Sequence, residues 1–172
     1  MSVALTESID LLQVASSGQR IAEQVSLAQL PRLVEALDSL GAQRTDEAGT
    51  TVDCRLELSC DSDGTVRIRG RLGTRWSLVC QRCLESFVDP VSLRVNWRSG
   101  TLPDGDFELG DEPVRLIDWV EDELLLALPP IPKHRDRKQC GQIARDYLVA
   151  TEEAPLRKPF ADLKNMLNDR RD

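Results

Sequence analysis

Several features that would place the 172-residue sequence in a common class of protein are missing from it. No stretch approaches the roughly 18 uninterrupted apolar residues that a membrane-spanning helix needs. The segment Met1–Leu12 contains Glu7 and Asp10 and has no basic residues ahead of an apolar core, so it does not look like a secretory signal. From these absences we expect a soluble, cytoplasmic protein.

Motifs of the common enzyme classes are absent as well. The sequence has no phosphate-binding Gly-rich loop, no Gly-x-Ser-x-Gly elbow and no His-Glu-x-x-His helix. His134 is its only histidine. The acids Glu121, Asp122 and Glu123 are consecutive in a predicted helix, so they fan over about 200° and cannot all face one substrate. A solvated face near a helix N-terminus explains them more simply, and we expect no enzymatic activity.

Aromatic residues are scarce, at 4% of the sequence, whereas 41% of the residues are hydrophobic and 30% are charged. This composition is sufficient for one core, and the length favours one domain over residues 1–172. No internal repeat is present. We expect the core at about 26–130, because residues 1–25 have only a weak apolar pattern that suggests edge contacts. The C-terminal tail, 131–172, is expected to pack loosely.

Three segments have the apolar spacing of helices. In the segment 26–40, Ser26 is a candidate N-cap, and Pro31 fits the first turn if the helix begins at Leu30. A second helix is predicted from Asp118 to about Ala127, with Asp118 as its capping residue. A short final helix is predicted to begin at Pro159.

Between the first two helices, residues 52–97 alternate between apolar and polar side chains, as half-buried strands do. Asp63-Gly64 predicts a tight hairpin turn, Gly73 predicts a bulge or a break in the second strand, and another strand is expected after Pro90. The expected fold is therefore α+β, with a curved antiparallel β-sheet, a partial barrel-like meander, packed with helices.

The net charge of −7 is distributed unevenly along the chain. Residues 66–98 contain seven arginines and two acids, a net charge of +5, whereas residues 99–130 contain nine acids and one arginine, a net charge of −8. The overall negative charge argues against a nucleic-acid partner, but the local charge does not. The protein therefore has two regions of opposite sign.

Arginine is suited to bidentate phosphate contacts, and alternate arginines in a strand project from one face of a sheet. The candidate RNA-binding residues are Arg67, Arg69, Arg71, Arg75, Arg82 and Arg94. The acidic segment, with Glu121, Asp122 and Glu123, is a candidate surface for a basic partner. The alternative is a solvated sheet face whose arginines pair with the acidic segment.

The five cysteines are odd in number and follow no export signal, so free or metal-bound thiols are expected rather than disulfides. Cys80 and Cys83 form a tight Cys-x-x-Cys pair, and His134 with Cys140 would complete a tetrahedral zinc site, although their spacing is wider than usual. Unligated thiols are the alternative. A redox pair would require a strand-to-helix context, which the flanking residues do not predict. Cys54 and Cys60 are predicted to lie in the core.

Two blocks of sequence resemble a known family. Residues 78–87, Leu-Val-Cys-Gln-Arg-Cys-Leu-Glu-Ser-Phe, look like the central signature of the bacterial YceD family, the large ribosomal RNA subunit accumulation proteins. The block 117–129, followed by Pro132, His134 and Cys140, agrees with it, and the tail 158–164 is a weaker match. Many members carry extra cysteines after the second block, which suggests a metal site.

The resemblance implies a non-enzymatic ribosome-assembly factor that supports synthesis, processing or stability of 23S ribosomal RNA in the large subunit. The implied partners are ribosomal RNA or a pre-50S particle and a basic large-subunit ribosomal protein. Two other functions stay open from the residues alone. One is a docking adaptor for such a basic protein without RNA contact, and the other is a Cys-x-x-Cys metal or redox protein.

Overall fold

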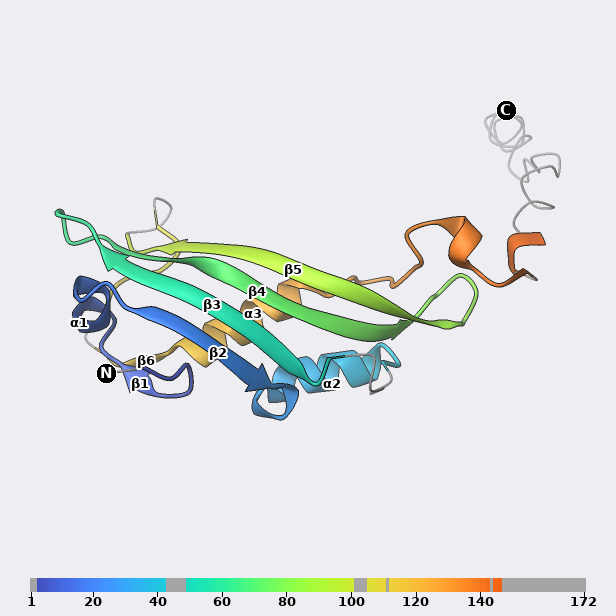
Figure 1. Ribbon diagram of the computed structural model, residues 1–172, viewed down its shortest axis with the longest axis horizontal. Coiled ribbons are helices and arrows are strands. Elements are labelled where there is room, and N and C mark those ends of the chain that lie inside the picture. Colours follow the sequence, from blue (N-terminus) through green and yellow to red (C-terminus); the bar gives the residue numbers. More distant parts are fainter. Residues whose placement is uncertain (1–2, 43–48, 101–104, 111, 143, 147–172) are drawn as a thin grey trace, which may run out of the picture. The chain divides into compact units, whose positions relative to one another are not determined.

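The computed structural model describes residues 3–42, 49–100, 105–110, 112–142 and 144–146 (Figure 1). The chain divides into two compact units, Met1–His134 and Arg135–Asp172. In the second unit, a short 3₁₀ helix η2 (Arg137–Gln139) begins at a capping box made by Asp136 and Gln139. The helix predicted from Pro159 lies outside the described residues. Within those residues, no helix combines the length and the apolar character needed to span a membrane.

Four antiparallel strands form the main sheet of the first unit, in the order β2-β3-β4-β5. Each strand pairs with its neighbours in sequence, so the sheet is the predicted meander, and it is not closed into a barrel (Figure 1). A two-stranded sheet pairs β1 (Ser8–Ile9) with β6 (Val114–Arg115). The predicted α+β class is confirmed. The strands of the main sheet are β2 (Arg20–Ser26), β3 (Thr51–Cys60), β4 (Val66–Val79) and β5 (Ser86–Arg98).

The helices of this unit are α1 (Leu11–Ser16), the 3₁₀ helix η1 (Leu27–Gln29), α2 (Pro31–Ser39) and α3 (Leu116–Ala127). Pro31 occupies the first turn of α2, as predicted for a start near Leu30, while Ser26 caps η1 instead. The predicted cap of α3 is wrong. The helix begins at Leu116, directly after strand β6 ends at Arg115, so Asp118 already lies inside the first turn. The N-cap residue is Arg115, and its side chain makes no capping bond.

The structure corrects two predictions about the strands. Gly73 does not break β4, because it pairs with Asp53 on one side and with Ser92 on the other. Strand β5 begins at Ser86 and runs through Pro90. The proline is tolerated because β5 is an edge strand, so the missing N–H group faces no neighbouring strand.

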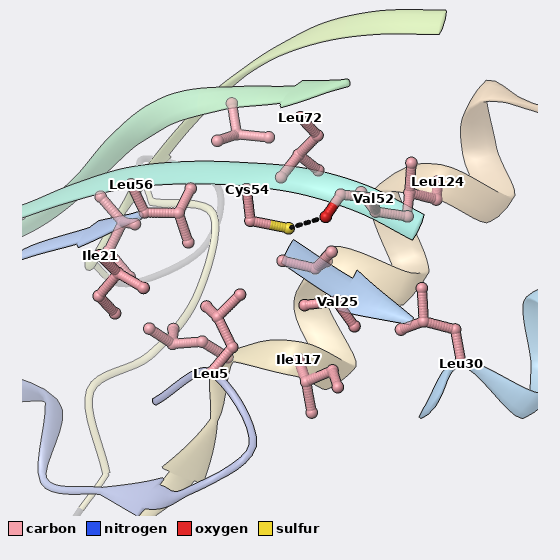
Figure 2. Close-up of a cluster of buried hydrophobic side chains, with 14 of the residues drawn as sticks. Leu5, Ile21, Val25, Leu30, Val52, Cys54, Leu56, Leu72, Ile117 and Leu124 are labelled. Atoms are coloured by element: carbon pink, nitrogen blue, oxygen red, sulfur yellow. Dashed lines mark hydrogen bonds between the residues drawn. The ribbon is translucent and has the colours of Figure 1, made fainter. Parts of the chain in front are cut away.

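The core lies between one face of the sheet and the helices. Figure 2 shows Ile21 and Val25 of β2, Cys54 and Leu56 of β3, and Ile117 and Leu124 of α3 converging. The N-terminal residues contribute more than the predicted edge contacts. Their fully or nearly buried side chains are Leu5, Ile9, Leu11, Ala15, Ile21 and Val25. The opposite face of the sheet, here called the outer face, carries the polar residues of the alternation.

Candidate functional site

The Cys80–Cys83 turn connects β4 to β5 and places two sulfurs close together. The Cys80 carbonyl accepts a hydrogen bond from the Leu84 N–H at 2.8 Å, and the Cys80 N–H donates to the Glu85 carbonyl at 2.9 Å. These bonds hold Leu84 at a φ of 62°, a left-handed conformation that disfavours leucine. The side chain of Leu84 is exposed, so it is the tight turn and not packing that requires this conformation.

Backbone N–H groups point at the Cys80 sulfur. The N–H groups of Arg82 and His134 donate to Cys80 Sγ at 3.4 and 3.5 Å. Burial, the largest single effect, raises the pKa of the Cys80 thiol, but the N–H groups of His134 and of the turn lower the pKa to about 6. A lowered pKa favours the thiolate, which is the form of cysteine that binds metals.

His134 reaches the same turn from the segment that follows α3. The Gln81 N–H donates to the Pro132 carbonyl at 2.8 Å, which holds this segment against the turn. His134 Nδ1 lies 3.5 Å from Cys83 Sγ, and its ring packs on Phe87 with centroids 4.7 Å apart. The imidazole is therefore oriented toward the sulfurs by both a backbone bond and a ring contact.

The ligand atoms of Cys80, Cys83 and His134 all lie within 4.8 Å of one another. Thiolate and imidazole are the ligands of structural zinc, and tetrahedral ligands at about 2.3 Å from zinc lie roughly 3.8 Å apart. A contraction of about 1 Å would let these groups hold a metal ion. Cys140, the fourth predicted ligand, belongs to the second unit, and its role stays a prediction.

The other two cysteines are outside this cluster. Cys54 is buried as predicted and donates a weak hydrogen bond to the Val52 carbonyl (Figure 2). Burial raises the pKa of its thiol to about 12, so it is a structural residue. Cys60 is half-buried at the end of β3 and packs against the core.

Strand pairing brings arginines together on the outer face. Arg71 lies directly opposite Arg55 on β3 and directly opposite Arg94 on β5. These three residues, here called the arginine row, are exposed. In the part of the chain that the structure describes, none of the three has an ion pair or a side-chain hydrogen bond. The row ends at Ala22 of β2, so no acid lies directly opposite any of its members; Asp53 and Glu57 flank Arg55 along β3 and are bonded to Gln24 and Arg20.

The remaining predicted arginines have different surroundings. Arg67 forms an ion pair with Asp61, and the Arg69 side chain donates to Asn96 at 3.1 Å. Arg75 is exposed further along β4, whereas Arg82 lies in the Cys80–Cys83 turn and not on a strand. Sequence analysis missed Arg55. The signal for it is the hairpin turn at Asp63-Gly64, whose register, continued along β3 and β4, places Arg55 opposite Arg71.

The three predicted partner-binding acids differ strongly in exposure. Glu121 is only 3% exposed. Its carboxylate accepts from the N–H groups of Arg32 and Leu33 at 2.7 and 3.1 Å and from the Arg32 side chain at 2.8 Å. It therefore caps α2, whose own N-cap residue supplies no side-chain bond. This position gives Glu121 a structural role.

Asp122 and Glu123 reach the surface but are also held by hydrogen bonds. Asp122 Oδ1 pairs with Arg32 at 2.7 Å, and Glu123 Oε1 accepts from the Trp97 indole at 2.8 Å. The ion pairs described for the acidic segment go to Arg32 and Arg115. None of these described pairs involves Arg55, Arg71 or Arg94.

The first unit is thus an open antiparallel sheet with helices on one face, arginines on the other and a thiol–imidazole cluster at one turn. No family model and no solved structure matched the chain. It is 30% identical over 153 residues to the large ribosomal RNA subunit accumulation protein YceD of Haemophilus influenzae, which covers 80% of this chain and 82% of the relative. The chain therefore belongs to the YceD family.

Proposed function

We propose that the protein is a non-enzymatic assembly factor of the large ribosomal subunit that binds ribosomal RNA with the outer face of its sheet. The name of the Haemophilus influenzae relative refers to accumulation of the large ribosomal RNA subunit. Such a factor would act in the cytoplasm on ribosomal RNA or a pre-50S particle. The arginine row is the observation that carries the proposal.

Three arginines in register are unfavourable in the isolated protein, because like charges directly opposite each other on neighbouring strands repel. No acid lies directly opposite Arg55, Arg71 or Arg94, and the two acids that flank Arg55 along β3, Asp53 and Glu57, are bonded to Gln24 and Arg20. An external anion would relieve the repulsion. Arginine binds phosphate through two parallel N–H groups, so the phosphate backbone of RNA is a chemically suitable ligand.

The outer face also has no aromatic side chain. Outward positions of β2 to β5 carry polar, charged or small residues together with Val79, Val88 and Pro90, while Trp76, Phe87 and Trp97 are on the core face. Sheets that recognise single-stranded RNA stack bases on aromatic residues, whereas duplex RNA is recognised mainly through its backbone and shape. We therefore propose that the arginine row contacts the backbone of a helical RNA segment.

Binding to fragments of 23S ribosomal RNA tests this function, with a helical hairpin compared against an unstructured strand. The variant carries Arg55→Gln, Arg71→Gln and Arg94→Gln. Its control carries Arg115→Gln, Lys138→Gln and Arg145→Gln, which remove the same charge from residues outside the main sheet. Loss of three phosphate contacts should weaken hairpin binding on the order of 50-fold near 0.15 M salt and reduce the salt slope by about 3.

Equal losses in the two triple variants would contradict the proposal, because net charge alone would then explain binding. Unchanged affinity in the Arg55, Arg71, Arg94 variant, with circular dichroism showing an intact fold, would contradict it as well. Tighter binding of the unstructured strand than of the hairpin would contradict the proposal that the arginine row contacts helical RNA. Nuclease-resistant capture of a basic ribosomal protein, without any RNA affinity, would favour the docking adaptor.

We also propose that one zinc ion is bound by Cys80, Cys83, His134 and Cys140. The N–H donors at Cys80 Sγ and the orientation of His134 toward Cys83 support the first three ligands, and the sequence supports Cys140. The ion would supply no chemistry to a substrate. Four protein ligands make a closed, structural site, which would fix the Cys80–Cys83 turn at the end of the β4–β5 hairpin.

A further inference from the structure

A cavity of about 360 Å³ opens beside α3, near the end of β5. Three aromatic side chains and three carboxylates line it: Trp97, Phe107, Trp119, Asp106, Asp122 and Glu123. The rings are arranged at angles to one another. Trp119 meets Trp97 edge-on at 5.5 Å between centroids, and Phe107 is tilted 55° against Trp119 at 4.7 Å. The residues come from three separate segments, so the cavity exists only in the folded chain.

Hydrogen bonds hold each carboxylate of this cavity in place. Glu123 Oε1 accepts from the Trp97 indole N–H at 2.8 Å, and Asp106 Oδ2 accepts from the Arg98 backbone N–H at 2.8 Å. Asp122 is held by Arg32 through its Oδ1 atom. Each of these bonds uses one oxygen, and a carboxylate has a second oxygen that can accept. The acceptors are therefore oriented before any ligand arrives.

We propose that this cavity binds the cationic side chain of a basic polypeptide segment, arginine in preference to lysine. A guanidinium group is attracted to the faces of Trp and Phe rings and stacks on them. It also matches carboxylate oxygens with parallel N–H donors. The carboxylates, of which only Asp122 is paired with a described cation, disfavour the phosphates of RNA at this surface. The inference does not depend on the arginine row, which lies on the other face of the sheet.

The tryptophans provide a local measurement. The protein has three; Trp97 and Trp119 line the cavity, whereas Trp76 is 1% exposed and lines a different cavity, between η1, α2 and β4. Indole N–H resonances of the full chain can be followed by NMR during titration with the peptide acetyl-Gly-Arg-Gly-Arg-Gly-amide. We expect the Trp97 and Trp119 resonances to shift and the Trp76 resonance to stay constant.

Two neutral replacements test the charge of ligand and protein separately. A citrulline peptide has the shape of the arginine peptide without its charge and should bind at least about 10-fold more weakly. In the protein, Glu123→Gln keeps an acceptor for the Trp97 indole but removes the negative charge. This variant should bind the arginine peptide more weakly by a similar factor. Glu108→Gln is the matched control, because Glu108 lies outside the cavity.

Equal binding of the citrulline and arginine peptides would overturn the inference. Equal weakening by Glu108→Gln and Glu123→Gln would also overturn it, because the general acidity of the segment would then be the cause. The same shifts with Mg²⁺ alone would indicate a metal site in place of a side-chain site. Tighter binding of a lysine peptide would reject the preference for arginine.

Discussion

Two groups of charged side chains on opposite sides of the main sheet differ in their bonding partners. On the outer face, Arg55, Arg71 and Arg94 stand in one row without a described partner. On the face covered by helices, Glu121 and Glu123 accept hydrogen bonds from α2 and from Trp97. The glutamates on the helix side thus take part in hydrogen bonds of the folded structure, whereas the arginine row makes no described ion pair or side-chain hydrogen bond.

Aromatic residues follow the same division. The strand alternation places Trp76, Phe87 and Trp97 on the core face together with the apolar residues. As a result, the outer face can attract phosphates but has no ring on which a base can stack, while the α3 cavity combines rings with carboxylates. The two faces therefore suit partners of opposite charge. The uneven charge along the sequence thus corresponds to two separate surfaces of the folded protein.

Like Glu121 and Glu123, the thiol–imidazole cluster of Cys80, Cys83 and His134 is held by hydrogen bonds within the fold. Removing the proposed zinc ion from it should lower the free energy of unfolding more than any other change considered. Zinc that binds only the folded state stabilises by about 4 kcal/mol when free zinc is about 1,000 times the dissociation constant. We expect one zinc per chain in protein purified with reductant. Chelation should lower the free energy of unfolding by about that amount, as measured by urea denaturation with and without chelator.

Cysteine variants make the zinc measurement specific. Cys83→Ser and Cys140→Ser should each lose the metal, whereas Cys60→Ser, at a half-buried cysteine outside the cluster, should retain it. Zinc retained at full stoichiometry and affinity in Cys83→Ser would refute the site. Retention only in Cys140→Ser would leave a three-ligand site and refute the proposed fourth ligand.

Glu121→Ala should have the second-largest effect. The substitution removes the acceptor for the N–H groups of Arg32 and Leu33 and leaves the start of α2 without a cap. Loss of the buried acceptor for two backbone N–H groups at a helix start costs about 2 kcal/mol. Asp122→Ala is the control, because Asp122 also pairs with Arg32 but is exposed, and exposed pairs contribute little. Similar losses in the two variants, measured by urea denaturation, would contradict the structural role of Glu121.

Sequence patterns predicted the faces of β3 and β4 but not strand β2. Alternation over residues 52–72 is regular, so the outward arginines Arg67, Arg69 and Arg71 followed from it. In β2 the alternation is interrupted at Glu23, a polar residue at a core-facing position. Its carboxylate accepts from the Leu5 N–H at 2.9 Å. A tertiary contact to the N-terminal segment thus satisfies this residue, and no local pattern could reveal that.

Sites were predictable where their residues are neighbours in sequence. Cys80 and Cys83 were found because one turn holds them, and His134 followed as the only histidine. The α3 cavity was missed because Trp97, Phe107 and Trp119 lie on separate segments and meet only through tertiary packing. Arg55 was missed because it lies outside the basic segment 66–98, and only strand pairing places it beside Arg71.

The smallest expected effect has the opposite sign. Arg71 stands between Arg55 and Arg94, so Arg71→Gln should relieve repulsion on both sides and raise the free energy of unfolding by about 0.5 kcal/mol. Salt screens exposed charges, with a Debye length of about 3 Å at 1 M, so the gain should disappear in urea denaturation at 1 M NaCl. Arg20→Gln is the control, since Arg20 is paired with Glu57 at 2.9 Å and should give no gain. Destabilisation by Arg71→Gln at low salt would show that the arginine row stabilises the fold. It would contradict the distinction drawn between the arginine row and the hydrogen-bonded glutamates on the helix side.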